Sequence, residues 1–144
     1  MRLFKSAAIA IAMIAAPAAA ITASADTLTT IAATAELPSG DFVRKNKTLR
    51  GSYTVIERDG STFIQFSDDF RASNGPDLKI FLSPNSIDTA TGNNATDGSI
   101  LLGELVKTRG VQEYEVPAGV NLADFGSVLV HCEAFSVLWG GSDL

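Results

Sequence analysis

The residues that could carry unusual chemistry lie close together near the C-terminal end of the sequence. The chain has one cysteine, one histidine and one tryptophan, and these are Cys132, His131 and Trp139. A thiol can exchange electrons or disulfides or ligate a metal, an imidazole can serve a catalytic triad or a metal, and an indole ring can stack on a ligand. The lone thiol is the feature that a functional hypothesis must explain first.

These residues fall in a segment that we predict to form two β-strands. Residues 126–141 are rich in valine and leucine, and the stretch is too short and too β-branched for a helix. Alternate side chains of a strand share a face, so Cys132 should point into the core with Val128 and Val130. Leu129, His131 and Glu133 should point the other way, toward a wetter face. Glu133 and Ala134 then connect to a last strand at residues 135–139, which Gly140 and Gly141 close.

Two interpretations of Cys132 follow from its surroundings. A reactive thiol must ionise, and a positive charge beside it promotes this. His131 adjoins Cys132 in the chain but should project to the opposite face of the strand, so the local sequence supplies no activation. The alternative is that Cys132 packs as a small hydrophobic residue in the core.

The sequence offers little else for catalysis or for a cofactor. It has no Cys-x-x-Cys motif and no second cysteine for a cluster. A Ser-His-Asp triad would need His131, but the Gly-x-Ser-x-Gly elbow is missing. We therefore expect no required cofactor and no independent catalytic activity. A mixed disulfide or a disulfide-linked dimer through Cys132 stays open.

A turn-rich segment at residues 68–77 supplies further candidate binding residues. Asp69, Asn74 and Asp77 bring carboxylate and amide oxygens, which hard cations such as calcium prefer. Their spacing matches no EF-hand loop, and Asn-Gly-Pro-Asp is explained as a tight turn before a strand. We therefore expect no metal site there. Trp139, with Phe135, is a candidate for stacking on a ligand, although aromatic residues at such positions more often belong to the core.

The N-terminal residues predict export. Arg2 and Lys5 precede an uncharged run that is rich in alanine and isoleucine, and Ala23-Ser24-Ala25 fits the small-x-small cleavage rule. We expect a bacterial signal peptide at residues 1–25, a flexible arm at residues 26–39 and one domain at residues 40–144. Once the signal is removed, no membrane insertion is expected, and the protein should be periplasmic or secreted.

The charge of the mature chain narrows the classes of partner. Removal of residues 1–25 takes away Arg2 and Lys5 and leaves 9 basic and 16 acidic residues, a formal charge of −7. Nucleic acids and anionic membranes recruit basic surfaces, so neither is expected as a partner.

Strand signals recur along residues 49–139. Residues 49–57 and 62–67 flank an Asp59-Gly60 turn that is typical of a β-hairpin. Further strands are predicted at residues 78–82, 99–106 and 111–116, with one helical turn near residue 122 and a long polar surface loop at residues 85–98. About eight short strands with Gly and Pro between them predict an all-β fold, an antiparallel β-sandwich with jelly-roll or barrel-like closure as variants.

Four blocks of sequence resemble the DM-thirteen domain family, also labelled the electron-transfer DM domain. They occupy residues 49–60, 69–83, 102–117 and 125–140. The most specific are Asn-Gly-Pro-Asp-Leu at residues 74–78 and Cys-x-x-Phe-Ser-Val at residues 132–137. The resemblance implies a β-rich extracytoplasmic module with a recurrent cysteine, here Cys132, for which a redox role is proposed. Members often have an aromatic residue before that cysteine, whereas this chain has His131.

Two functional hypotheses follow. In the first, the protein is an exported redox or electron-transfer accessory module that uses Cys132 with an extracytoplasmic redox partner. In the second, it is a non-catalytic extracytoplasmic binding or adhesion module, and Cys132 is structural. The accessibility of the thiol distinguishes them.

Overall fold

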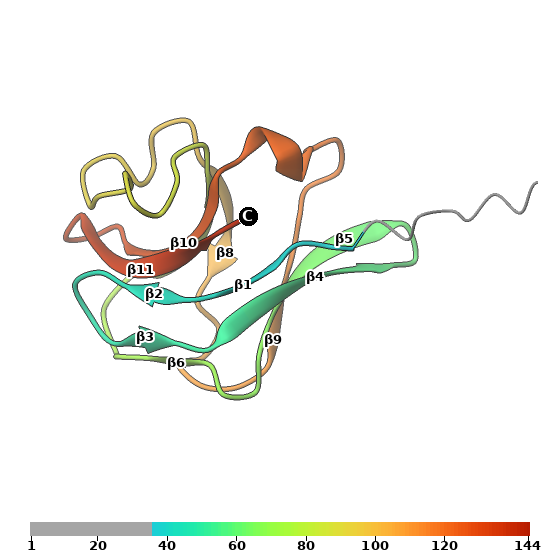
Figure 1. Ribbon diagram of the computed structural model, residues 1–144. Coiled ribbons are helices and arrows are strands. Elements are labelled where there is room, and N and C mark those ends of the chain that lie inside the picture. The colour runs from blue at the N-terminus through green and yellow to red at the C-terminus, as the bar shows by residue number, and fades with distance from the viewer. Residues whose placement is uncertain (1–35) are drawn as a thin grey trace, which may run out of the picture. The chain divides into compact units, whose positions relative to one another are not determined.

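The structure is a computed structural model that describes residues 36–144, and this part of the chain is all-β (Figure 1). Eleven short strands form three antiparallel sheets, and the helical content of these residues is one 3-10 turn, η1 (Leu122–Asp124). No helix in residues 36–144 has the length and apolar character needed to cross a bilayer. The predicted signal peptide lies outside the described residues, as does most of the predicted arm. Ser39, the last residue of that arm, begins the first strand.

The first sheet has four strands in the order β1-β4-β5-β9. Their bounds are β1 (Ser39–Asp41), β4 (Ser52–Arg58), β5 (Ser61–Phe66) and β9 (Gln112–Glu115). The hairpin predicted around Asp59-Gly60 is confirmed, because β4 pairs with β5 from Tyr53↔Phe66 to Arg58↔Ser61. Both turn residues have positive φ, 53° at Asp59 and 81° at Gly60, which matches the twist of the flanking strands.

The second sheet has five strands in the order β2-β11-β10-β7-β8, and a two-stranded ladder of β3 and β6 completes the fold. The five strands are β2 (Val43–Arg44), β7 (Leu78–Ser83), β8 (Ile100–Glu104), β10 (Ser127–Cys132) and β11 (Val137–Asp143). The ladder pairs β3 (Leu49–Arg50) with β6 (Arg71–Ala72).

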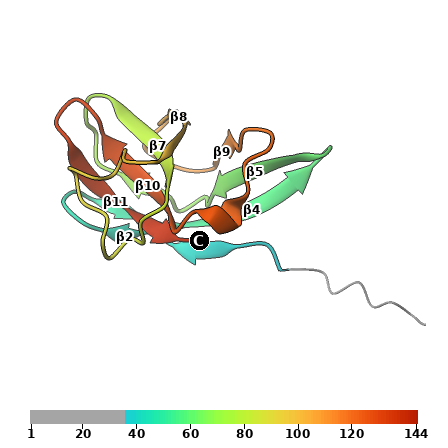
Figure 2. The same cartoon turned by 90° about the horizontal axis from the view of Figure 1, so that it is seen from above.

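The two larger sheets share one hydrophobic core, so the predicted antiparallel sandwich is confirmed (Figures 1 and 2). The first sheet contributes Tyr53 and Ile64, and the second contributes Ile80, Val128 and Val130. Within residues 36–144 the sheets stay open, with β8 and β9 as edge strands, and do not close into a barrel. The structure has more strands than the roughly eight predicted. β1, β2 and β6 are too short to leave a pattern in the sequence, and the strand predicted at residues 49–57 is divided into β3 and β4 at Gly51, whose φ is 101°.

The last strand differs from its prediction. Residues 133–136 form the turn, Phe135 is 69% exposed, and β11 runs on through Gly140 and Gly141 to Asp143. A Cβ at Gly140 would overlap the carbonyl of Val43, and one at Gly141 would overlap that of Val128. The glycine pair therefore allows neighbouring strands to approach closely and does not end the strand.

The outer face of β10 is covered, and the expectation of a wetter face there is wrong for His131. His131 is 2% exposed, whereas Glu133, beyond the strand, is exposed. The loop at residues 84–99 folds over this face and packs its apolar residues onto the sheet (Figure 2). This second core consists of Phe81, Ile87, Ala90, Ala95, Leu129 and Leu138. β10 is thus buried on both faces, on one by the main core and on the other by a long loop that looks polar in sequence.

Candidate functional site

The thiol of Cys132 is fully buried at the end of β10. Its exposed fraction is 0%, and its register partners are Leu78 on β7 and Val137 on β11. The face predicted from alternation is confirmed, because Cys132 belongs to the main core together with Val128 and Val130. Its Sγ donates a hydrogen bond to the Pro76 carbonyl oxygen at 2.9 Å.

Pro76 belongs to the segment of residues 73–77, which we term the 73–77 loop. Four hydrogen bonds attach the two ends of this loop to neighbouring parts of the domain. Ser73 N donates to Thr48 O at 3.0 Å, and the Ser73 carbonyl accepts from Trp139 Nε1 at 3.0 Å. At the other end, Pro76 O accepts from Cys132 Sγ and Asp77 O accepts from Glu133 N at 3.2 Å. Asn74 and Gly75 lie between these two ends, and neither makes a backbone hydrogen bond within the described residues. The middle of the loop is therefore the part most easily displaced.

Trp139 packs against the same loop. The indole is 4% exposed, and it lies so near Gly75 that a Cβ there would be 2.5 Å from Cζ2 and 2.8 Å from Cη2. Glycine is required at residue 75 for this close approach, because any larger residue would contact the ring too closely. Trp139 is thus occupied by the loop and presents little surface on which a ligand could stack.

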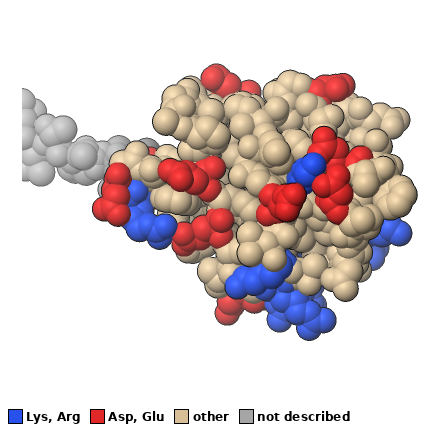
Figure 3. Space-filling view, turned by 180° about the vertical axis from the view of Figure 1, so that it is seen from behind, with Lys and Arg blue, Asp and Glu red and all other residues tan. Residues whose placement is uncertain are grey.

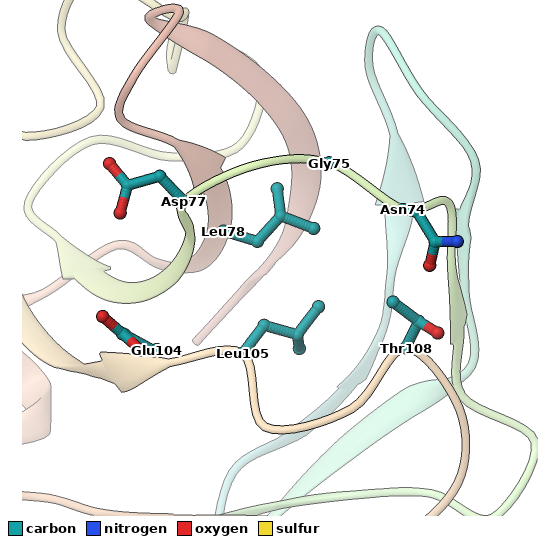
Figure 4. A pocket seen from close by; sticks show the side chains of 7 residues that line it. All are labelled: Asn74, Gly75, Asp77, Leu78, Glu104, Leu105 and Thr108. Atoms are coloured by element: carbon teal, nitrogen blue, oxygen red, sulfur yellow. The ribbon is translucent and has the colours of Figure 1, made fainter.

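Residues of the 73–77 loop also line a cavity of about 510 Å³ (Figure 4). It separates the 73–77 loop and the start of β7 from the segment that follows β8. Asp77 and Glu104 lie at one end, Asn74 and Thr108 at the other, and Leu78 and Leu105 extend into the space between (Figure 4). Cys132 does not line the cavity, but Pro76, to which its thiol is bonded, sits between two lining residues.

An ion-pair cluster marks the acidic end of the cavity. Lys79 Nζ contacts Asp77 Oδ1 at 3.1 Å and also pairs with Glu133. The hydrogen bonds that Lys79 donates, to Glu133 first and then to Asp77, raise the pKa of its ammonium, so the group stays charged. Asp77 has a φ of 55°, a left-handed conformation that Asp adopts more readily than most residues. The turn and its two charges hold the C-terminal end of the loop in place.

His131 lies on the opposite side of β10 from the thiol. Burial lowers its pKa, and the nearby charges of Glu133 and Asp77 only partly oppose this effect. Its Nδ1 is buried without a hydrogen-bond partner among the described residues, and its ring meets Phe81 edge-on at a centroid distance of 6.1 Å. A neutral imidazole that faces the second core cannot activate Cys132.

The structure brings most of the predicted site residues together. Asn74 and Asp77 line the cavity, and Cys132 and Trp139 hold the loop that carries them. Asp69 lies apart, where its carboxylate accepts a hydrogen bond from Ser67 Oγ. In residues 36–144, no three His, Cys, Asp or Glu side chains converge as a metal site requires.

Sequence reasoning missed one wall of the cavity, which Glu104, Leu105 and Thr108 form. These residues have ordinary types and lie at the end of an edge strand or just after it, so nothing in their pattern marks them. Pro76 was also missed as a partner of the thiol.

Comparison with known protein families identifies a related family. The model of a family described as Electron transfer DM13 matches residues 41–143. No curated protein and no solved structure is similar at the significance required.

Proposed function

The chain belongs to the Electron transfer DM13 family, and on that premise we propose that it is an exported electron-transfer accessory module whose redox group is the Cys132 thiol. The observation that supports this role is the hydrogen bond from Cys132 Sγ to Pro76 O. The thiol is bound to a loop that lines a cavity, and the middle of that loop has no backbone hydrogen bonds of its own among the described residues. Displacement of the loop exposes the sulfur without unfolding the sandwich.

The reaction assigned to the open form is thiol–disulfide exchange with an extracytoplasmic partner that carries a disulfide. Cys132 loses its proton to solvent, and the thiolate attacks one sulfur of the partner disulfide. A bond forms between Cys132 Sγ and that sulfur, the partner S–S bond breaks, and the second partner sulfur leaves as a thiolate. Cys132 is thereby oxidised to a mixed disulfide, and the partner sulfur that leaves is reduced. The reaction needs no cofactor, in keeping with the single cysteine.

A second function is favoured by the complete burial of Cys132. A thiol with 0% exposure in a core with Val128 and Val130 is what a structural cysteine requires. In that case the cavity between the 73–77 loop and residues 104–108 serves a non-catalytic extracytoplasmic binding or adhesion module.

Thiol labelling in low concentrations of urea separates the two functions. If the loop opens locally, an aromatic disulfide reagent will label Cys132 in native protein at a rate that changes little with urea. If the cysteine is structural, labelling will follow global unfolding, whose free energy falls by about 1–3 kcal/mol per molar urea. Labelling only by global unfolding would refute the redox role. Cys132→Ala is the blank for the reagent.

Export is tested separately. The basic start, the apolar run and Ala23-Ser24-Ala25 support cleavage before Asp26. Expression in a bacterial host should yield protein in the periplasm or medium that begins at Asp26, as read by mass spectrometry. Recovery of uncleaved protein from the cytoplasm would refute export and leave the chemistry of Cys132 to be judged alone.

A further inference from the structure

Three arginines face one another across the short ladder of β3 and β6. Arg50 on β3 is directly opposite Arg71 on β6, and Arg71 bridges in turn to Arg109 in the segment before β9. Residues that are directly opposite on neighbouring strands project from the same face. The three side chains therefore form a row, and we term it the arginine row.

No ion pair in the described part of the chain balances the positive charge of this row. Within residues 36–144, the ion pairs join Arg58 to Glu113 and Lys79 to Asp77 and Glu133, and none involves the arginine row. Arg71 donates to the backbone carbonyls of Asp68 and Phe70, which fixes its position without neutralising it. Like charges directly opposite destabilise a sheet, so this arrangement needs an explanation in a chain with a net charge of −5.

A second cavity of about 360 Å³ lies against the row. Its lining is the three arginines with Thr48, Ala72 and Ser73. Ser73 Oγ is buried and has no hydrogen-bond partner among the described residues. Two hydroxyl-bearing residues and three arginines thus line one space. Figure 3 shows positive side chains gathered at the lower edge of the molecule, the end where Figure 1 places β3 and β6.

From this geometry we infer that the arginine row and its cavity bind a tetrahedral oxyanion of the phosphate class. Guanidinium groups bind phosphate oxygens through paired, charge-assisted hydrogen bonds, and a multiply charged anion relieves the repulsion among all three. A single carboxylate would balance only one of them. The volume is at the small end of the range for ligand pockets, so the site accommodates a phosphate or sulfate group with a small attached body.

The test is a titration of the full chain with inorganic phosphate, inorganic sulfate and a small phosphomonoester at constant ionic strength, read by calorimetry and by Tm. Phosphate should raise the Tm of the wild type relative to chloride, because a ligand of the folded state stabilises it. Arg50→Gln and Arg109→Gln should each weaken phosphate binding by about tenfold or more, as expected for the loss of a charge-assisted contact. Arg44→Gln, on β2 and outside the cavity lining, is the matched control and should bind as the wild type does.

The ligand-free proteins give an independent readout. Without phosphate, Arg50→Gln and Arg109→Gln should have a Tm equal to or above that of the wild type, because one repelling charge is gone. This separates a lost site from a misfolded variant. The inference is overturned if phosphate and sulfate leave the wild-type Tm unchanged, or if they raise it equally in both variants. Binding of a glutamate-rich peptide without binding of phosphate would also overturn it. Tighter binding of the phosphomonoester than of free phosphate would support the inference and identify an organic phosphate as the ligand.

Discussion

Gly75→Ala should open the cover over Cys132 while leaving the sandwich folded. The added methyl group would lie 2.5 Å from Cζ2 of Trp139, and the indole cannot retreat because it is buried and hydrogen-bonded to Ser73. The φ of Gly75 lies outside the left-handed region, so the substitution acts through this contact and not through backbone strain. The closed loop is destabilised, and the open loop is not.

The size of the effect follows from the cost of overpacking. Forcing a methyl group into a well-packed site destabilises it by about 1–3 kcal/mol. Since the open loop escapes this penalty, its population relative to the closed loop should rise by about 5- to 150-fold. The labelling rate of Cys132 by an aromatic disulfide reagent in native buffer should rise by the same factor, with little dependence on urea.

Gly126→Ala is the matched control. Its added Cβ would lie 2.9 Å from the backbone of Asn85, so it is also overpacked, but it is at the start of β10 and far along the strand from Cys132. It should lower the urea midpoint and speed only the labelling that depends strongly on urea. Equal native labelling rates in Gly75→Ala and the wild type, both following global unfolding, would refute the loop as the route to the thiol.

Three further predictions concern stability and titration. Burial raises the pKa of Tyr53 and Tyr114, the only tyrosines, to about 12, and the charge of Asp143 adds to the effect at Tyr53. The absorbance of phenolate should therefore stay low near pH 10 and appear toward pH 12 or on unfolding. Because the unfolded phenols ionise near pH 10, the stability that they contribute is complete below about pH 10 and falls as the pH rises toward 12, which urea midpoints would reveal. Burial lowers the pKa of His131, so the stability that the neutral imidazole contributes is present above about pH 6.5 and is lost as the pH falls through the pKa of the folded state. The urea midpoint of His131→Gln should therefore fall less steeply with acid than that of the wild type. Cys132→Ala removes a buried sulfur and its bond to Pro76, and should lower the free energy of unfolding by about 1 kcal/mol in urea titrations; an unchanged midpoint would show that the thiol contributes nothing to packing.

The parts of the fold that could be predicted are those set by local chemistry. Asp59 and Gly60 tolerate positive φ, so they fix the hairpin of β4 and β5 whatever surrounds it. Alternation along β10 correctly placed Cys132 in the core beside Val130. The resemblance to the DM-thirteen family was also correct.

The parts that could not be predicted depend on contacts between distant residues. Gly140 and Gly141 were predicted to end the last strand, but their role is set by the carbonyls of Val43 and Val128, which lie on other strands. His131 read as exposed, because the burial of its face depends on a loop of polar composition. The cavity beside the 73–77 loop needs the pairing of β7 with β8, which periodicity does not specify.

The indole that supports the 73–77 loop has a use beyond packing. Trp139 is the only tryptophan, and the loop contacts both its Nε1–H, at Ser73, and its six-membered ring, at Gly75. The fluorescence of the protein should therefore report the position of one short segment, with emission shifting to longer wavelength when the loop lifts and water reaches the ring. Loop motions of this kind fall in the nanosecond to millisecond range, which temperature-jump and stopped-flow fluorimetry cover between them. The chain thus contains its own optical probe of access to Cys132, and it requires no added dye.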